Sequence, residues 1–123
     1  MSNVAQMEDN LSYMRDFRPY TEEEYAVIEK VKEAMAAVPT IPCTACHYCT
    51  DGCPMNIPIP DIFSVKNQQT VYNTGDGAKR NYGFETRDKG KASDCIQCGQ
   101  CEAACPQGLP IIELLQECAA SLE

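Results

Sequence analysis

Two stretches of the chain carry the same run of cysteines, C-x2-C-x2-C-x3-C-P, and this repeat constrains the fold more than any other feature. The eight cysteines of the two runs are Cys43, Cys46, Cys49, Cys53, Cys95, Cys98, Cys101 and Cys105. The second run follows the first at an offset of 52 residues, and the copy extends further, because Pro58-Ile59 aligns with Pro110-Ile111. Each copy predicts a cysteine loop followed by a proline-led amphipathic helix. One such unit cannot bury its apolar face alone, so we expect the two to pack about a pseudo-two-fold axis.

The spacing within each run is typical of proteins that hold two [4Fe–4S] clusters, where the fourth cysteine ligates the other cluster. Three thiolates with two residues between neighbours can bind three corners of one cluster. The longer C-x3-C spacing that follows directs the fourth thiolate away. We therefore predict two [4Fe–4S] clusters with crossed ligands. One takes Cys43, Cys46, Cys49 and Cys105, and the other takes Cys95, Cys98, Cys101 and Cys53. Zinc is the alternative, but structural zinc sites usually use two separated C-x2-4-C pairs, which these runs fit poorly.

The chain has nine cysteines among 123 residues, so a full disulfide framework would leave one thiol over. Residues 1–20 lack the apolar stretch of a secretory signal, and no apolar run approaches the length of a membrane span. These features predict a reducing, cytoplasmic setting with no membrane span. The net charge is −8 before any cluster is bound. We therefore expect no nucleic-acid partner, and a basic face on any partner that is steered by charge.

Apolar spacing predicts a mainly α fold, with about four helices around the two clusters. Residues 4–17 carry an apolar stripe, and a second helix begins with a capping box formed by Thr21 and Glu24 and ends at Pro39. A third helix is expected over residues 61–73, and a closing helix from Pro110 onward. Its buried face comprises Ile111, Leu114, Leu115, Cys118 and Leu122. Residues 78–94 are polar and weakly patterned, so we expect a loop there, attached to the core by Tyr82 and Phe84.

We divide the chain into an N-terminal helical segment, residues 1–40, and a two-cluster domain, residues 41–123. His47 lies between two ligand positions and is either a solvated or outer neighbour of the cluster, or else a ligand or a proton shuttle. Cys118 lies outside both runs on an apolar stripe and is either a buried structural thiol or a ninth ligand. The sequence contains no glycine-rich phosphate loop and no nucleophile–base pattern. We therefore assign no catalytic residue.

The first run within IPCTACHYCTDGCPMNIPIP, together with CIQCGQCEAACPQGLPI, resembles the C-terminal iron–sulfur region of aldo/keto reductase-family oxidoreductases. That family joins a (β/α)8 barrel, which carries an Asp-Tyr-Lys-His tetrad and a nicotinamide site, to a helical ferredoxin-like domain. Residues 1–11 resemble the segment around the last barrel helix, while the barrel itself has no counterpart here. The resemblance implies a fragment or stand-alone relative of that tail, whose partner is the missing barrel or another redox protein. The N-terminal stripe would then pack elsewhere, for example on a second copy in a homo-oligomer.

These observations predict one-electron transfer through paired [4Fe–4S] clusters, as the electron-carrying part of an oxidoreductase. One alternative is the iron–sulfur subunit of another assembly, such as an anaerobic dehydrogenase or a heterodisulfide-reductase-like complex. The other alternative is a structural metal-binding module without a redox role.

Overall fold

The computed structural model describes residues 1–123, which form two compact units, Met1–Ala37 and Val38–Glu123. The secondary structure is entirely helical, which confirms the mainly α fold. In chain order the elements are α1 (Val4–Arg15), α2 (Glu22–Ala36), α3 (Ile59–Tyr72), α4 (Asp76–Glu85), the short 3-10 helix η1 (Ala92–Asp94), α5 (Gln100–Ala104) and α6 (Ile111–Leu122). None of these helices combines the length and the apolar character needed to cross a membrane.

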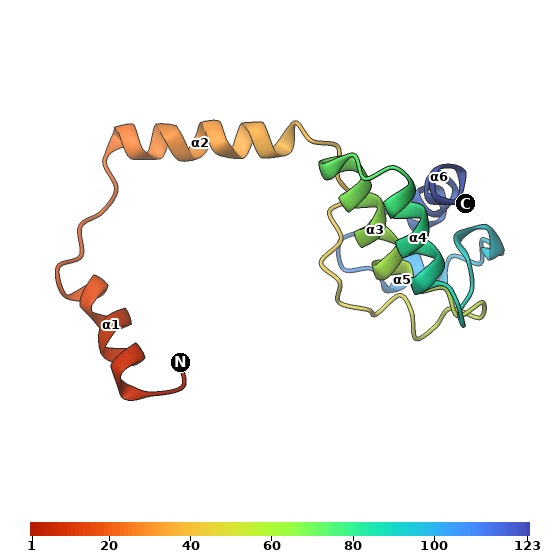
Figure 1. Ribbon diagram of the computed structural model, residues 1–123, viewed down its shortest axis with the longest axis horizontal. Helices are drawn as coiled ribbons and strands as arrows, with labels where there is room; N and C mark the ends of the chain where they lie inside the picture. Colours follow the sequence, from red (N-terminus) through yellow and green to blue (C-terminus); the bar gives the residue numbers. More distant parts are fainter. The chain divides into compact units, whose positions relative to one another are not determined.

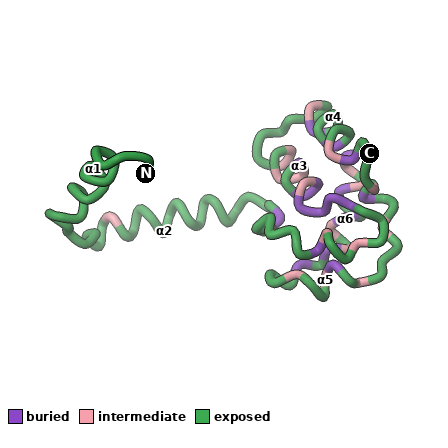
Figure 2. Tube along the Cα trace, turned by 90° about the horizontal axis from the view of Figure 1, so that it is seen from below, coloured by how far each residue is buried: buried purple, intermediate pink, exposed green.

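The first unit consists of α1 and α2, and neither helix contains a buried residue (Figure 2). The side chain of Asn3 caps α1 by accepting a hydrogen bond from the Gln6 N–H at 2.9 Å. The predicted capping box of α2 is confirmed. Thr21 Oγ1 accepts from the Glu24 N–H at 3.3 Å, and Glu24 Oε2 accepts from the Thr21 N–H at 2.8 Å.

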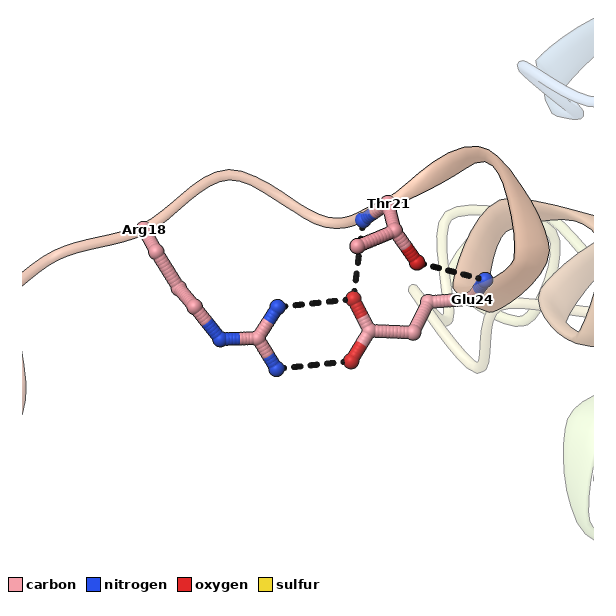
Figure 3. A network of polar contacts seen from close by, with 3 residues as sticks. All are labelled: Arg18, Thr21 and Glu24. Atoms are coloured by element: carbon pink, nitrogen blue, oxygen red, sulfur yellow. Dashed lines mark hydrogen bonds and ion pairs between the residues drawn. The ribbon is translucent and has the colours of Figure 1, made fainter.

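An arginine extends this cap into a small polar network (Figure 3). The Arg18 guanidinium donates to both Glu24 carboxylate oxygens, with distances of 3.0 and 2.7 Å. The hydrogen bond from Arg18 and then the one from the Thr21 backbone lower the pKa of Glu24 to about 2. The carboxylate thus stays charged at the positive end of the α2 dipole, where a negative charge is favourable.

The second unit packs α3, α4 and α6 around one core, and α3 and α4 lie side by side (Figure 1). Both repeat copies contribute to this core through equivalent positions. Ile59 and Phe63 of α3 are 1% and 0% exposed, and Ile111 and Leu115 of α6 are each 1% exposed. The apolar face predicted for the closing helix is confirmed, with Leu114 half-buried at its edge.

The entry to each of these helices has the same local structure. The backbone angles φ and ψ are −79° and 67° at Pro58, and −75° and 72° at Pro110. The first helical N–H groups also repeat their partners, since Ile62 donates to Pro58 O and Leu114 donates to Pro110 O, both at 3.0 Å. The duplication read from the sequence is therefore a duplication of backbone conformation.

The expectation of a loop over residues 78–94 is wrong for its first part, because α4 extends to Glu85. Ala78 and Tyr82, one helical turn apart, are buried at 1% and 3% exposure, and this packing stabilises the helix despite its glycines. Tyr82 attaches the segment to the core as expected. Phe84 does not, since it is 68% exposed and lies under the Arg87 guanidinium.

Candidate metal centre

The eight cysteines of the two runs line two separate cavities. The first cavity is lined by Cys43, Cys46, Cys49 and Cys105. The second cavity is lined by Cys53, Cys95, Cys98 and Cys101. Each cavity thus combines three cysteines of one run with the last cysteine of the other, which is the grouping that crossed ligands require.

The walls of both cavities are mainly apolar. The first cavity is bounded by side chains that include Ile59, Phe63, Leu109 and Ile111. The second is bounded by side chains that include Ile57, Ile59, Ile96 and Leu115. Ile59 lines both cavities and is 1% exposed, so one buried side chain borders the two sites.

Equivalent cysteines in the two runs have equivalent exposure. The third cysteine of each run is the most buried, with Cys49 at 7% and Cys101 at 8%. The second cysteine of each run, Cys46 or Cys98, is exposed. The remaining four are half-buried, namely Cys43, Cys53, Cys95 and Cys105. Each cavity therefore has a protected interior and one edge at the protein surface.

Tight backbone turns bring the cysteines of each run together. Residues with positive φ occur at three matched pairs of positions: Ala45 (52°) and Gln97 (58°), His47 (63°) and Gly99 (76°), Asn56 (51°) and Gly108 (62°). Non-glycine residues rarely adopt this conformation, and such outliers concentrate at functional sites. Recurrence in both copies indicates that the cysteine loops require it. Sequence reasoning missed Ala45 and Gln97, whose residue types give no signal for it, and also Asn56, although asparagine adopts this conformation more readily than most residues.

All nine cysteines are free thiols, and burial perturbs the ones inside the cavities. Burial raises the pKa of Cys49 to about 11 and raises the pKa of Cys101 as well. The thiolate is the form that ligates metal, so these groups would release their protons on binding a metal centre. Four thiols around one apolar cavity match the donor set of a [4Fe–4S] cluster. No three His, Cys, Asp or Glu side chains lie close enough together to hold a single metal ion.

His47 and Cys118, whose roles the sequence did not decide, differ in exposure and in their relation to the cavities. His47 is exposed and contributes to the lining of the first cavity. Cys118 is 0% exposed within α6 and lines neither of the two cysteine cavities, and burial raises its pKa to about 11. Its position matches that of a buried structural thiol.

Two four-cysteine cavities in a small helical unit define the chain as a protein of the iron–sulfur class. It belongs to the 4Fe-4S dicluster domain family, whose model matches residues 42–110 and so includes all eight cysteines of the runs. The family's description, a dicluster, agrees with the number of cavities.

The chain is also similar to one subunit of the ion-translocating oxidoreductase complex of Buchnera aphidicola subsp. Acyrthosiphon pisum (strain APS). The two are 29% identical over 83 residues, which cover 67% of this chain and 15% of that protein. The chain thus matches only a small part of this curated relative. No solved structure is significantly similar to the chain.

Proposed function

We propose that the chain transfers electrons one at a time through two [4Fe–4S] clusters held in the two cavities. The observation that supports this most directly is the grouping of the eight cysteines into two sets of four, each set around an apolar cavity. Such clusters supply reversible one-electron chemistry when bound. The protein supplies the thiolates, the exclusion of water and the orientation toward a partner.

Different residues would serve these roles. Cys43, Cys46, Cys49 and Cys105 would hold the first cluster, and Cys53, Cys95, Cys98 and Cys101 the second. Ile59 borders both cavities, so the two centres would be near neighbours and electrons could pass between them. Cys46 and Cys98 are exposed, so their loops form the edges through which electrons would enter and leave.

The similarity to part of an ion-translocating oxidoreductase complex supports a role as an iron–sulfur part of a multi-subunit oxidoreductase. Its partner would then be another redox protein of the assembly. A second candidate context is the aldo/keto reductase-type tail, which the residues from Ile41 to Pro60 favour. Affinity purification under anaerobic conditions separates the two: the first context predicts co-purifying redox proteins, and the second predicts a barrel protein that binds a nicotinamide nucleotide.

Anaerobic reconstitution with iron and sulfide tests the function itself. We expect about eight iron atoms and about eight acid-labile sulfides per chain, a brown colour, and two interacting paramagnetic centres after reduction. Fewer than about four iron atoms per chain, or a colourless zinc-bound protein, would contradict the proposal. Clusters that never change oxidation state at accessible potentials would support the structural-module alternative instead.

A further inference from the structure

The approach to the first cysteine run is held by one side chain from α3. Residue 41 lies two places before Cys43, and the Asn67 amide pairs with both of its backbone groups. Asn67 Oδ1 accepts from the Ile41 N–H at 2.7 Å, and Asn67 Nδ2 donates to Ile41 O at 2.8 Å. Ile41 O also accepts from the Cys43 N–H at 2.8 Å. The Asn67 clamp, meaning these two side-chain bonds, therefore ties the first ligand position to the helix that borders the first cavity.

The equivalent position in the second run is residue 93, and Glu123 holds it. Glu123 Oε1 accepts from the Ser93 N–H at 3.1 Å, and Glu123 Oε2 accepts from Ser93 Oγ at 2.7 Å. The Tyr82 hydroxyl donates to Glu123 Oε1 at 2.5 Å and accepts from the Ala92 N–H at 2.7 Å. Ala92 O accepts in turn from the Cys95 N–H at 3.3 Å. The bonds made by these two side chains form the Tyr82–Glu123 clamp.

The two clamps hold equivalent backbone positions, but they use unrelated residues. The repeat offset of 52 residues aligns Asn67 with Ala119, whose methyl group cannot form hydrogen bonds. The second copy uses instead a tyrosine from α4, which belongs to the segment between the runs, and a carboxylate that follows α6. Two unrelated sets of side chains thus hold the equivalent backbone position in each copy, which indicates that the cysteine loops need this position to be held in place.

We propose that Asn67 is the positioning residue of the first cluster and that Tyr82 and Glu123 are the positioning residues of the second. This inference rests on the proposed function. Ile41 is only 9% exposed and Ala92 only 2%. Loss of the Asn67 amide therefore leaves the Ile41 N–H without a partner, and loss of the Tyr82 hydroxyl does the same to the Ala92 N–H, in each case next to one ligand loop. The other loop keeps its own clamp. Removing one clamp therefore loosens one cluster and leaves the other unchanged.

The test uses the reconstituted holoprotein and follows each cluster separately. A ferrous chelator is added anaerobically with iodoacetamide, and peptide mapping identifies which cysteines become alkylated as iron is released. For Asn67→Ala we expect alkylation at Cys43, Cys46, Cys49 and Cys105 to become roughly tenfold faster, the factor that fits an unpaired buried backbone group. For Tyr82→Phe we expect the same acceleration at Cys53, Cys95, Cys98 and Cys101.

Matched controls remove similar groups at nearby positions. Gln68→Ala deletes an amide beside Asn67 that takes no part in the clamp, and Tyr72→Phe deletes an exposed hydroxyl at the end of α3. We expect both to match the wild type at all eight cysteines. Glu123→Gln retains an acceptor oxygen toward Tyr82 and Ser93 and should preserve the wild-type rates, whereas Glu123→Ala should accelerate release from the second cluster only.

The outcomes separate this proposal from the function on which it rests. A wild-type chain that takes up no iron and sulfide would overturn both. If the wild type binds two clusters but the clamp variants show the same alkylation rates as the control variants, the clamp proposal alone is overturned. Equal loss of both clusters in every clamp variant would also overturn them, because it indicates a general structural role.

Discussion

Gly90 lies so close to Met55 that a Cβ atom at position 90 would be 2.1 Å from the Met55 carbonyl oxygen. The Gly90 N–H also donates to Asn56 O at 3.1 Å. Met55 follows Cys53 by two residues and lines the second cavity. This contact therefore attaches the segment between the two runs to the turn that carries the last cysteine of the first run.

Replacing Gly90 with alanine should destabilise the protein. The new methyl group would meet backbone at Met55 and also the Ile57 side chain at 3.0 Å, so the chain must shift, at a cost of about 1–3 kcal/mol. Denaturant unfolding of the holoprotein measures this cost. The control is Gly83→Ala, because Gly83 lies within α4 with open space around its Cβ position and should be neutral or stabilising by up to about 1 kcal/mol. Equal midpoints for Gly90→Ala and the wild type would contradict the steric argument.

Cys118 should be dispensable for the clusters. Its side chain is buried in α6 away from both cysteine cavities. We expect Cys118→Ala to keep the full iron and sulfide content while losing about 1 kcal/mol of stability through a small cavity. Cys118→Ser should cost more, because it buries a hydroxyl group in the core. Iron analysis and unfolding of the two variants check this, and a loss of about half the iron in Cys118→Ala would make Cys118 a ligand.

The reactivity of Cys118 offers an independent check. Burial raises its pKa to about 11, so at neutral pH the group remains a thiol and reacts slowly with alkylating reagents. In the folded holoprotein it should stay unmodified as long as the core is intact. Rapid labelling of Cys118 in a protein that retains both clusters would show that the core opens locally.

The parts of this structure that the sequence predicted are those determined by local spacing. Short-range geometry at the cysteine runs and at the prolines at 58 and 110 determines the loops and the starts of α3 and α6. The duplication of these features could therefore be predicted from the sequence. Helix α4 could not be predicted in this way, because it depends on the burial of Tyr82 against distant elements. Its glycines also weaken the helical pattern of the sequence. The Asn67 and Tyr82–Glu123 clamps were missed for the same reason. Each joins residues at least ten positions apart, and nothing in a lone Asn or Glu indicates such a partner.

The charge of Glu24 should persist in acid. Its pKa is lowered to about 2 by hydrogen bonds from Arg18 and Thr21, so its contribution to the start of α2 is fully present above about pH 4.5 and is lost as the pH falls through about 2. Carbon NMR of the Glu24 carboxyl group during an acid titration measures this directly. Arg18→Gln should raise the pKa toward its ordinary value. A Glu24 carboxyl that titrates at its ordinary value in the wild type would show that the Arg18 pair does not persist in solution.

Mutation can test directly whether each cysteine run supplies its last cysteine to the cluster of the other run. Cys53 belongs to the first run but lines the second cavity, and Cys105 belongs to the second run but lines the first. Cys53→Ala should therefore destabilise the cluster held by the second run and spare the one at Cys43, Cys46 and Cys49. Cys105→Ala should do the reverse.

Iron content, together with alkylation of the cysteines in each variant, measures which cluster remains. We expect about half of the wild-type iron in each case, because loss of one of four thiolate ligands leaves that cluster labile while the other keeps its complete set. In Cys53→Ala the newly reactive thiols should be Cys95, Cys98 and Cys101, all far along the chain from the mutated residue. If the reactive thiols were instead Cys43, Cys46 and Cys49, each run would hold its own cluster, and the two cavities would not correspond to the two centres.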